Sequence, residues 1–291
     1  MADDELRGMF GIEGKVAVIT GAAGILYTTI SKALAGFGVK VALLDIREEA
    51  ATGLADEIAG AGGDAVGLAC DVLQRESIDG AAKAILDRYG QVDVLINGAG
   101  GNHPKATATA EMPFFDIPPD ALRWVFELNC IGTLLPCQVF GRHLAERREG
   151  IILNTSSMAA FSPLTRVVAY SAAKAAISNF TEWLAVHMSQ NFGPNIRVNA
   201  IAPGFFHTMQ NHKLLYDTGN DYPDDIDAAT GEVKVPLSKR GEQILAHTPM
   251  GRFGVPADLV GTIVWLLSPA AKFVHGIVVP IDGGFNAFSG V

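Results

Sequence analysis

The sequence predicts an α/β protein built on a doubly wound parallel sheet, because short apolar runs alternate with stretches of helical periodicity. Helical periodicity is clear at residues 30–37 and 169–183. The apolar runs lie at residues 15–20, 40–44, 68–72, 92–96 and 274–281. This alternation is typical of parallel strands covered by helices on both faces. No linker or repeat interrupts it, so we expect residues 1–291 to form a single domain.

The first strand and its turn indicate a dinucleotide site. The first apolar run is closed by Gly21 and Gly24, and the second ends in Asp45, about twenty residues after the glycines. In a Rossmann fold this spacing places a pyrophosphate at the helix N-terminus and an acidic side chain on the adenosine ribose hydroxyls. Asp45 would repel a 2′-phosphate, so we expect NAD rather than NADP. Arg47, two positions later, weakens that preference.

The glycine turn departs from the usual dinucleotide pattern. Ile25 and Tyr27 occupy positions where glycine normally lets the backbone approach the phosphate and lets the helix approach the strand. We therefore expect a modified cofactor loop. A plain βα turn without a ligand is the alternative interpretation.

Two later strand ends also favour a cofactor. Asp71 closes the third apolar run, where its carboxylate can accept from an adenine amino group, and Asn97-Gly98-Ala99-Gly100 follows the fourth run. Ligands of open parallel sheets lie outside the carboxyl ends of the strands, so small residues at 98–100 leave room for one. The alternative is that these small residues serve packing alone.

Three residues suited to proton transfer lie close together in the chain. Tyr170 and Lys174 are four apart in a predicted helix and therefore share one face, and Ser157 lies thirteen positions before the tyrosine. A free tyrosine has a pKa of about 10, and a neighbouring ammonium favours the phenolate, so we expect Lys174 to lower the pKa of Tyr170. The alternative is a solvated surface pair.

Taken together, the motifs resemble the short-chain dehydrogenase/reductase family from about residue 14 to the C-terminus. The residues that carry the resemblance stand in the family's order and near its spacings. They are Thr20-Gly21, Asp71, Asn97-Gly98-Ala99-Gly100, Asn129, Ser157, Tyr170 with Lys174, Arg197-Val198-Asn199, Pro203-Gly204 and Thr208.

The resemblance implies a role for each catalytic residue. Tyr170 is the implied general acid/base, Ser157 holds the substrate oxygen, Lys174 binds the nicotinamide ribose, and Asn129 supports a water that relays protons. Thr208 is implied to contact the nicotinamide carboxamide. The full set expected around NAD is Gly21, Gly24, Ile25, Leu26, Asp45, Asp71, Val72, Asn97, Ala99, Gly100, Tyr170, Lys174, Pro203, Gly204, Phe206 and Thr208.

Further segments resemble the D-mannonate oxidoreductase (fructuronate reductase) branch of the family, which tolerates the altered glycine turn. These segments are residues 100–106, 156–159, 210–211, 247–254 and 282–291. The resemblance implies an NAD-dependent interconversion of D-mannonate and D-fructuronate. A gluconate- or polyol-type dehydrogenase, or a catalytically silent NAD-binding protein, stays open as an alternative.

A sugar acid needs hydroxyl partners and a cation from the protein. We expect the substrate to be bound by Asn102, His103, Met158, Gln210 and Arg252. Asn102 and Gln210 can bind hydroxyl groups in either direction, and His103, Lys105 or Arg252 can supply positive charge.

Composition excludes several classes of function. The net charge of −9 and the pI near 5.2 count against a nucleic-acid partner and slightly against an anionic substrate. No apolar run reaches about eighteen residues, so we expect no membrane span. The three cysteines lack metal-type spacing, and the histidines do not cluster, so we expect no metal, reduced thiols and a cytoplasmic protein.

The last third of the chain predicts a lid and an oligomer contact. Residues 207–248 are long and polar and follow Pro203-Gly204, which suits a mobile substrate lid. Disorder without function is the alternative. The Gly-rich tail carries Phe285 and Phe288, which we expect to be exposed and to contact another subunit of a homo-oligomer, a tetramer.

Overall fold

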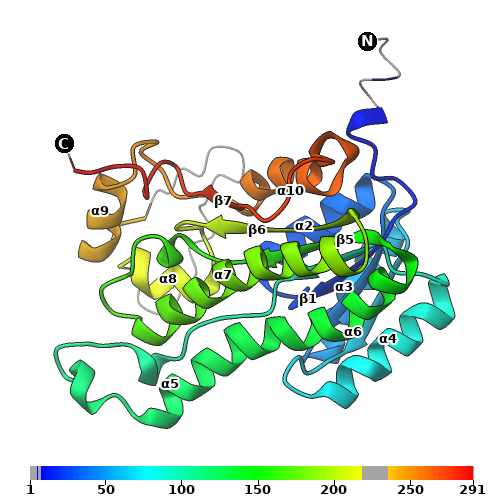
Figure 1. Ribbon diagram of the computed structural model, residues 1–291. Coiled ribbons are helices and arrows are strands. Elements are labelled where there is room, and N and C mark those ends of the chain that lie inside the picture. Colours follow the sequence, from blue (N-terminus) through cyan, green and yellow to red (C-terminus); the bar gives the residue numbers. More distant parts are fainter. Residues whose placement is uncertain (1–4, 6–7, 218–234, 291) are drawn as a thin grey trace.

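The computed structural model of the chain describes residue 5, residues 8–217 and residues 235–290. Within these residues, seven parallel strands form one sheet in the order β3-β2-β1-β4-β5-β6-β7, which confirms the doubly wound sheet (Figure 1). The strands are β1 Val16–Thr20, β2 Lys40–Asp45, β3 Ala65–Ala69, β4 Val94–Asn97, β5 Glu149–Thr155, β6 Asn195–Pro203 and β7 Val278–Ile281. The chain reverses its direction of winding between β1 and β4, where ligands of such sheets bind.

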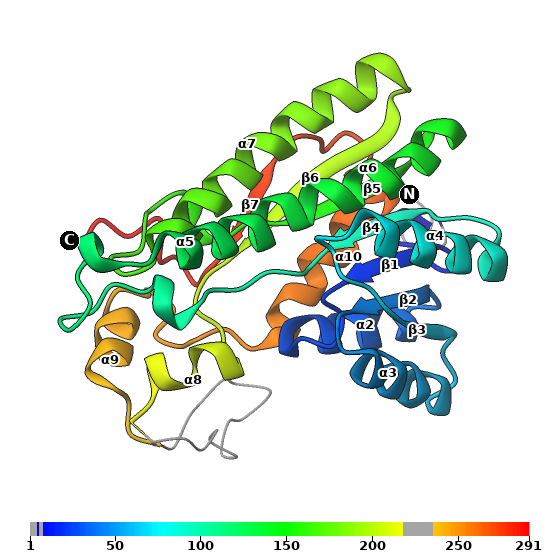
Figure 2. The ribbon, with the colours of Figure 1, turned by 90° about the horizontal axis from the view of Figure 1, so that it is seen from below.

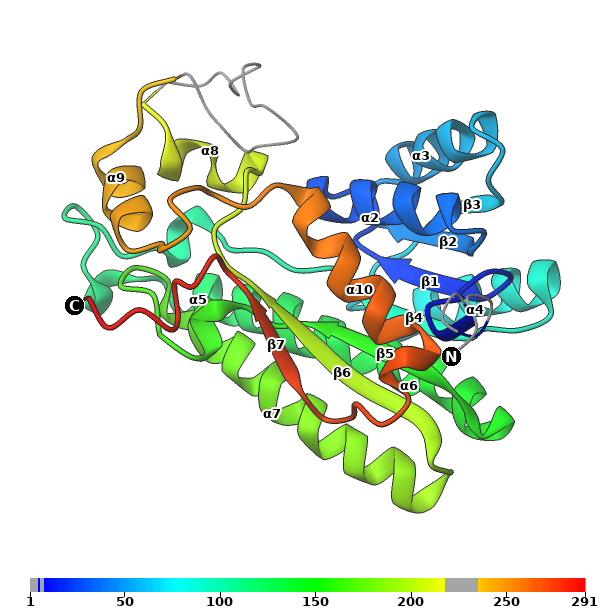
Figure 3. The same cartoon turned by 90° about the horizontal axis from the view of Figure 1, so that it is seen from above.

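Helices cover both faces of the sheet. Alternate side chains of β1 point to opposite faces: Ala17 and Ile19 join one apolar cluster, Val16 and Val18 the other. The first cluster lies under α2 Ile25–Gly36, α3 Glu48–Gly60 and α10 Val260–Leu267 (Figure 3). The second lies under α4 Arg75–Tyr89, α6 Gly132–Arg147 and α7 Val168–Asn191 (Figure 2). Both faces of each central strand are therefore dry, which explains the uninterrupted apolar runs.

Helix α2 begins earlier than its periodicity predicted. It starts at Ile25, directly after the N-cap Gly24, rather than near residue 30. The physical reason is the replacement of glycine: Ile25 and Tyr27 tolerate helical dihedrals better than glycine, which loses more backbone entropy in a helix. The altered turn is thus the first turn of a helix.

The third strand ends sooner than expected. β3 stops at Ala69, so Asp71 lies in the following turn and not at a strand terminus. The amide of Asp71 donates to Ser77 Oγ at 3.0 Å, and its carboxylate accepts from the Leu73 amide at 2.9 Å. The side chain is held by the turn that starts α4.

The aromatic tail packs on its own chain. The ring of Phe285 lies 5.2 Å from that of Phe205 and 4.8 Å from that of His247, which also lies 5.1 Å from Phe288. Both phenylalanines are half-buried, so the expectation that they are exposed is wrong. The homo-oligomer stays a prediction, and exposed tail phenylalanines no longer support it.

The predicted lid is described only at its two ends. Residues 218–234 lie outside the described residues. On either side, α8 Met209–Leu215 and α9 Lys239–Ala246 lie beyond the carboxyl ends of β6 and β7 (Figure 1). Their core is Leu215, Tyr216, Ile244 and Phe253. The mobile lid therefore stays a prediction.

None of the described helices is long and apolar enough to cross a membrane. The three cysteines are free thiols, and all are buried.

Candidate active site

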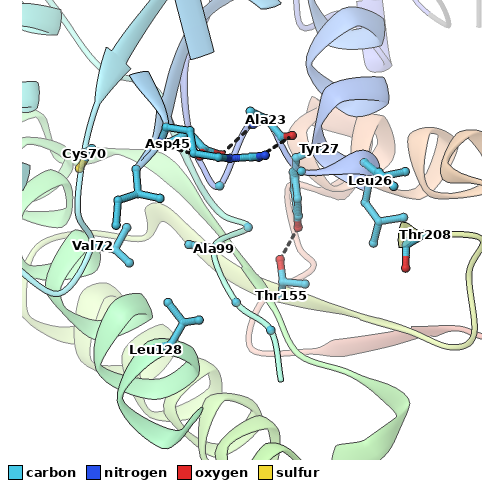
Figure 4. A pocket seen from close by; sticks show the side chains of 18 of the residues that line it. Ala23, Leu26, Tyr27, Asp45, Cys70, Val72, Ala99, Leu128, Thr155 and Thr208 are labelled. Carbon is cyan, nitrogen blue, oxygen red and sulfur yellow. Dashed lines mark hydrogen bonds and ion pairs between the residues drawn. The ribbon is translucent and has the colours of Figure 1, made fainter. Parts of the chain in front are cut away.

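A cavity of about 520 Å³ opens at the carboxyl ends of the strands. It runs from the end of β2 and its following residues, past the turn after β1, to the first turns of α7 and α8 (Figure 4). The predicted cofactor residues that line it are Gly21, Gly24, Ile25, Leu26, Asp45, Asp71, Val72, Ala99, Gly100, Tyr170, Lys174 and Thr208. A long cavity of this size, walled by strand ends, suits an extended ligand such as a dinucleotide.

Asp45 is held rigidly at one end of the cavity. One carboxylate oxygen accepts from the Ala23 amide at 3.1 Å, and the other accepts from the amide and Nε of Arg47 at 3.1 and 3.3 Å. Arg47 also donates from Nη2 to the carbonyl of Ala23 (Figure 4). The carboxylate thus reaches the cavity with a partly compensated charge.

The middle of the cavity offers backbone donors. Gly21 has a φ of +63°, and a Cβ there would lie 2.8 Å from two backbone atoms of Ala99, so only glycine fits. Helix α2 starts at Gly24 with no side-chain cap and no acidic residue in its first turn. Its first amide groups and its dipole therefore suit the pyrophosphate of a dinucleotide.

Tyr27 forms part of the cavity wall between α2 and the sheet. Its side chain is 4% exposed, and its hydroxyl is hydrogen-bonded to Thr155 Oγ1 (Figure 4). Burial, with the nearby Tyr170 adding to it, raises the pKa of Tyr27 to about 12, so the phenol stays neutral.

Lys174 is a buried ammonium at the other end of the cavity. It is 3% exposed, and its Nζ donates to the carbonyl of Thr155 at 2.8 Å. Desolvation lowers the pKa of Lys174 to about 8, because the charged form loses its hydration. Its Nζ lies 5.5 Å from the ring centre of Tyr170. Lysine and tyrosine therefore face the cavity together, as their spacing predicted.

The expected lowering of the Tyr170 pKa is wrong for this structure. Burial raises the pKa of Tyr170, and a hydrogen bond with Ser157 offsets part of the rise. The physical reason is that Lys174 directs its ammonium to the Thr155 carbonyl. Burial thus favours the neutral phenol of Tyr170.

Ser157 is placed by a short turn. It precedes the 3₁₀ turn η4 Met158–Ala160, and its Oγ accepts from the amide of Ala159 at 3.1 Å. With its hydroxyl placed in this way, Ser157 offsets part of the rise in the pKa of Tyr170, which lines this end of the cavity.

Asn129 braces the loop after β4. It lies in a π-helical segment, Glu127–Ile131, between α5 Pro119–Phe126 and α6, an insertion that is frequent at functional sites. Its Oδ1 accepts from the Gly101 amide at 3.1 Å, and its Nδ2 donates to the carbonyls of Gly101 and Val125 at 2.6 and 2.8 Å. A Cβ on Gly100 would lie 2.7 Å from Asn129 Oδ1 and 3.3 Å from Lys174 Nζ. The loop, the amide and the ammonium thus touch at Gly100.

Four predicted cofactor residues lie behind the cavity wall. Asn97 is 1% exposed and donates from Nδ2 to Asn154 Oδ1 and Cys137 Sγ. Pro203 ends β6, and Gly204 follows so close to Asp282 that a Cβ there would lie 2.6 Å from it. Phe206 is 2% exposed. These residues shape the base of the site, while Thr208, the N-cap of α8, reaches the cavity.

Of the predicted substrate residues, none whose side chain the structure describes is among those that line the cavity. Asn102 donates to Thr107 Oγ1 at 2.8 Å, and its buried Oδ1 has no donor among the described residues. His103 accepts from the Lys105 amide at 3.1 Å and lies edge-on to Trp124. Met158 is 1% exposed. The side chain of Gln210 lies outside the described residues.

Arg252 has an internal partner. Its guanidinium donates to both oxygens of Asp258, at 2.7 and 2.9 Å, and Asp258 also accepts from the Val255 amide at 2.9 Å. The ion pair lowers the pKa of Asp258 and raises the pKa of Arg252. A carboxylate substrate would have to compete with Asp258, which counts against Arg252 as its ligand.

Sequence reasoning did not assign several lining residues. They are Ala23, Tyr27, Ile46, Arg47, Cys70, Gly101, Leu128 and Thr155. Thr155, at the end of the fifth strand, could have been found from the rule that ligands lie at strand ends. Leu128 carries no such signal, since it reaches the cavity only through the turns of the π-helical segment.

Comparison with known proteins agrees with this geometry. The sequence model described as short chain dehydrogenase matches residues 15–218. The chain belongs to this family. A second model, described as enoyl-(acyl carrier protein) reductase, matches residues 228–286. The protein is therefore a short-chain dehydrogenase/reductase.

Individual relatives are similar over the whole chain. UxuB of Bacillus subtilis (strain 168), an uncharacterized oxidoreductase, is 45% identical over 96% of this chain and 98% of its own length. A crystal structure of a provisionally named D-mannonate oxidoreductase from Haemophilus influenza, with bound NAD, is 43% identical. It has a TM-score of 0.86 and covers 97% of this chain and 98% of that one.

A gluconate 5-dehydrogenase from Burkholderia cenocepacia, in complex with NADP and tartrate, is 26% identical. It has a TM-score of 0.81 and covers 96% of this chain and 98% of that one. Relatives of this short-chain dehydrogenase/reductase thus include structures with either dinucleotide.

Gly100→Ala is expected to lower kcat about 10²-fold, because the new Cβ displaces Asn129 or Lys174, and small misplacements at a catalytic centre cost rates of this order. Steady-state kinetics measures it. Gly53→Ala in α3 is the control, since a Cβ there meets nothing within 4 Å. Wild-type turnover in Gly100→Ala would contradict the close contact.

Proposed function

We propose that this short-chain dehydrogenase/reductase interconverts a secondary alcohol and a ketone of a sugar acid with NAD(H), and that the pair is D-mannonate and D-fructuronate. The observation that carries the proposal is the meeting of Tyr170 and Lys174 at one end of a cavity whose other end holds Asp45, with Ser157 acting on Tyr170 from beside that end. That arrangement suits hydride transfer beside a proton donor.

The residues divide the chemistry between them. When bound, the nicotinamide supplies or takes up the hydride. In reduction, Ser157 holds the carbonyl oxygen by hydrogen bonding, and the neutral Tyr170 donates its proton to that oxygen as charge develops there. Lys174 places a positive charge next to the resulting phenolate and loses that charge as the pH rises through about 8. In oxidation Tyr170 accepts the proton instead.

Asn102 follows the cavity residue Gly101 in the loop after β4 and offers a hydrogen-bond acceptor to a polyhydroxylated substrate. The buried Oδ1 of Asn102 is an acceptor without a donor among the described residues, and a substrate hydroxyl would satisfy it. This feature suits D-mannonate and also D-gluconate, so a gluconate-type dehydrogenase is the second candidate. The Burkholderia gluconate 5-dehydrogenase, similar over 96% of this chain, supports keeping it.

The substrate carboxylate needs a cation that is not already committed. Arg166 and Arg240 meet this need, since neither forms an ion pair with a carboxylate of the described residues. Burial lowers the pKa of Arg240, and the charge of Arg166 lowers it further, so the two guanidinium groups lie near one another. Arg240 donates to Thr165 Oγ1 at 3.0 Å, which ties it to the segment just before α7 and Tyr170. Two neighbouring guanidinium groups suit a carboxylate.

NAD is the proposed cofactor because Asp45 stands where a 2′-phosphate would lie. The bound NAD of the Haemophilus structure supports it. The cytoplasmic location and the tetramer stay predictions from the sequence.

Tyr170→Phe is expected to bind NADH as the wild type does and to lose about 10²–10⁴-fold in turnover of D-mannonate, the range for a lost acid/base group. Stopped-flow or steady-state absorbance of NADH measures turnover, and NADH fluorescence measures binding. Full activity in this variant would place the proton donor elsewhere and sink the proposed chemistry.

Asp45→Ala is expected to narrow the preference for NADH over NADPH, because the carboxylate that repels a 2′-phosphate is lost while Arg47 stays. The ratio of kcat/KM for the two cofactors measures it. The assignment of NAD is wrong if the unmodified protein prefers NADPH.

Arg166→Ala and Arg240→Ala are each expected to lower kcat/KM for the sugar acid about tenfold or more, the equivalent of a charged hydrogen bond, and to spare a neutral polyol. Alanine at 103 and 252 provides the comparison, and Arg252→Ala should lower the melting temperature through the loss of the Asp258 pair. If none of the four variants changes the acid-to-neutral ratio, the sugar-acid assignment loses its physical basis.

A further inference from the structure

Tyr27 fills a space that the family's glycine would leave open. Its ring lies so close to Gly98 that a Cβ on that glycine would be 2.5 Å from two ring carbons. The ring is therefore clamped between α2 and the turn after β4, and its position allows little adjustment. The hydroxyl at the end of this clamped ring points to β5 (Figure 4).

The direction of the hydrogen bonds can be assigned. Thr155 Oγ1 donates to the carbonyl of Asn97 at 2.6 Å. A threonine hydroxyl has one proton, so in its bond with Tyr27 it must be the acceptor and Tyr27 the donor. The chain of bonds runs from Tyr27 through Thr155 to the backbone of β4.

This chain of side-chain bonds lies where the pairing of β4 with β5 ends. The register between β4 and β5 ends at the pair Asn97 and Asn154, and Thr155 is the last residue of β5. At this strand end the side chain of Thr155 adds two bonds, to the carbonyl of Asn97 and to the hydroxyl of Tyr27. Its carbonyl is the acceptor for Lys174 Nζ at 2.8 Å.

We propose that Tyr27 is a positioning residue for catalysis: by donating to Thr155 it fixes the carbonyl that holds the Lys174 ammonium beside Tyr170. This inference rests on the proposed catalytic roles of Lys174 and Tyr170, and not on the identity of the sugar acid. The tyrosine at the altered glycine position is thus coupled to the proton-transfer group through one residue.

Tyr27→Phe keeps the ring against Gly98 and removes only the donor. We expect kcat to fall about tenfold, with the KM of the alcohol and the dissociation constant of NADH unchanged, since the ammonium loses its fixed acceptor while both binding surfaces stay. Thr155→Val should show the same loss, and Thr155→Ser, which keeps the hydroxyl, should restore wild-type kcat.

The double variant Tyr27→Phe/Thr155→Val decides whether the two residues act as one chain. Its kcat should equal that of Thr155→Val, because Thr155→Val already removes the acceptor of the Tyr27 bond and the second change has no further bond to remove. Tyr89→Phe is the matched control. Tyr89 lies on α4, outside the cavity, and its hydroxyl donates to the Asp64 carboxylate at 3.0 Å. Removing this hydroxyl should leave kcat unchanged. D-mannonate with NAD is the probe, and D-gluconate replaces it if D-mannonate is not turned over.

Three results would overturn the inference: an unchanged kcat in Tyr27→Phe, losses that multiply in the double variant, or a loss confined to NADH binding. If Tyr27→Phe fails to fold by circular dichroism, the comparison of Thr155→Val with Thr155→Ser decides, and equal kcat values refute it. Tyr170→Phe in the same assay separates the hypotheses. If Tyr170→Phe keeps full turnover, the proposed chemistry fails. If Tyr170→Phe loses turnover while Tyr27→Phe keeps it, only the role of Tyr27 is refuted.

Discussion

The buried ammonium of Lys174 is the constraint around which the site is organised. A charged group that loses its water must be compensated by hydrogen bonds. The Thr155 carbonyl provides one, and it can do so only because the end of β5 and the first turns of α7 meet at the same edge of the sheet. Gly100 leaves room on the other side of the ammonium, where Asn129 braces the loop. Strand, helix and loop are therefore positioned by a single side chain.

The same burial sets the acid/base properties of the pair. Desolvation favours the neutral form of both groups, so it raises the pKa of Tyr170 and lowers the pKa of Lys174. The two shifts move the pKa values of the pair apart, with that of Lys174 near 8 and that of Tyr170 above its usual value of 10. A neutral phenol near a cation is suited to give a proton to a developing alkoxide. The pair thus works through its shared environment.

The altered glycine turn shows how a family pattern can be rebuilt. Three bulky residues at 25–27 start α2 one turn earlier than its periodicity suggested, and the phosphate-binding end of the helix is kept by Gly21 and Gly24. The bulk is accommodated by Gly98 in the facing strand turn. Side chains at 25–27 limit access to the backbone of the first turn of α2, and the Tyr27 hydroxyl in that turn is hydrogen-bonded to Thr155 at the end of β5.

The sequence by itself determined the fold class, five of the seven strands and most of the cavity wall, because apolar strands and their polar ends are local patterns. It placed Asp45, Ala99, Tyr170 and Lys174 correctly at one cavity. Only the tertiary structure decided which side chains were already engaged: Arg252 by Asp258, the tail phenylalanines by Phe205 and His247, and the Lys174 ammonium by Thr155. Such partners lie far apart in the chain, and desolvation depends on everything packed around a group. Residue spacing and periodicity do not show which side chains pair or how far each is desolvated, so the pairing and the pKa shifts could be found only from the fold.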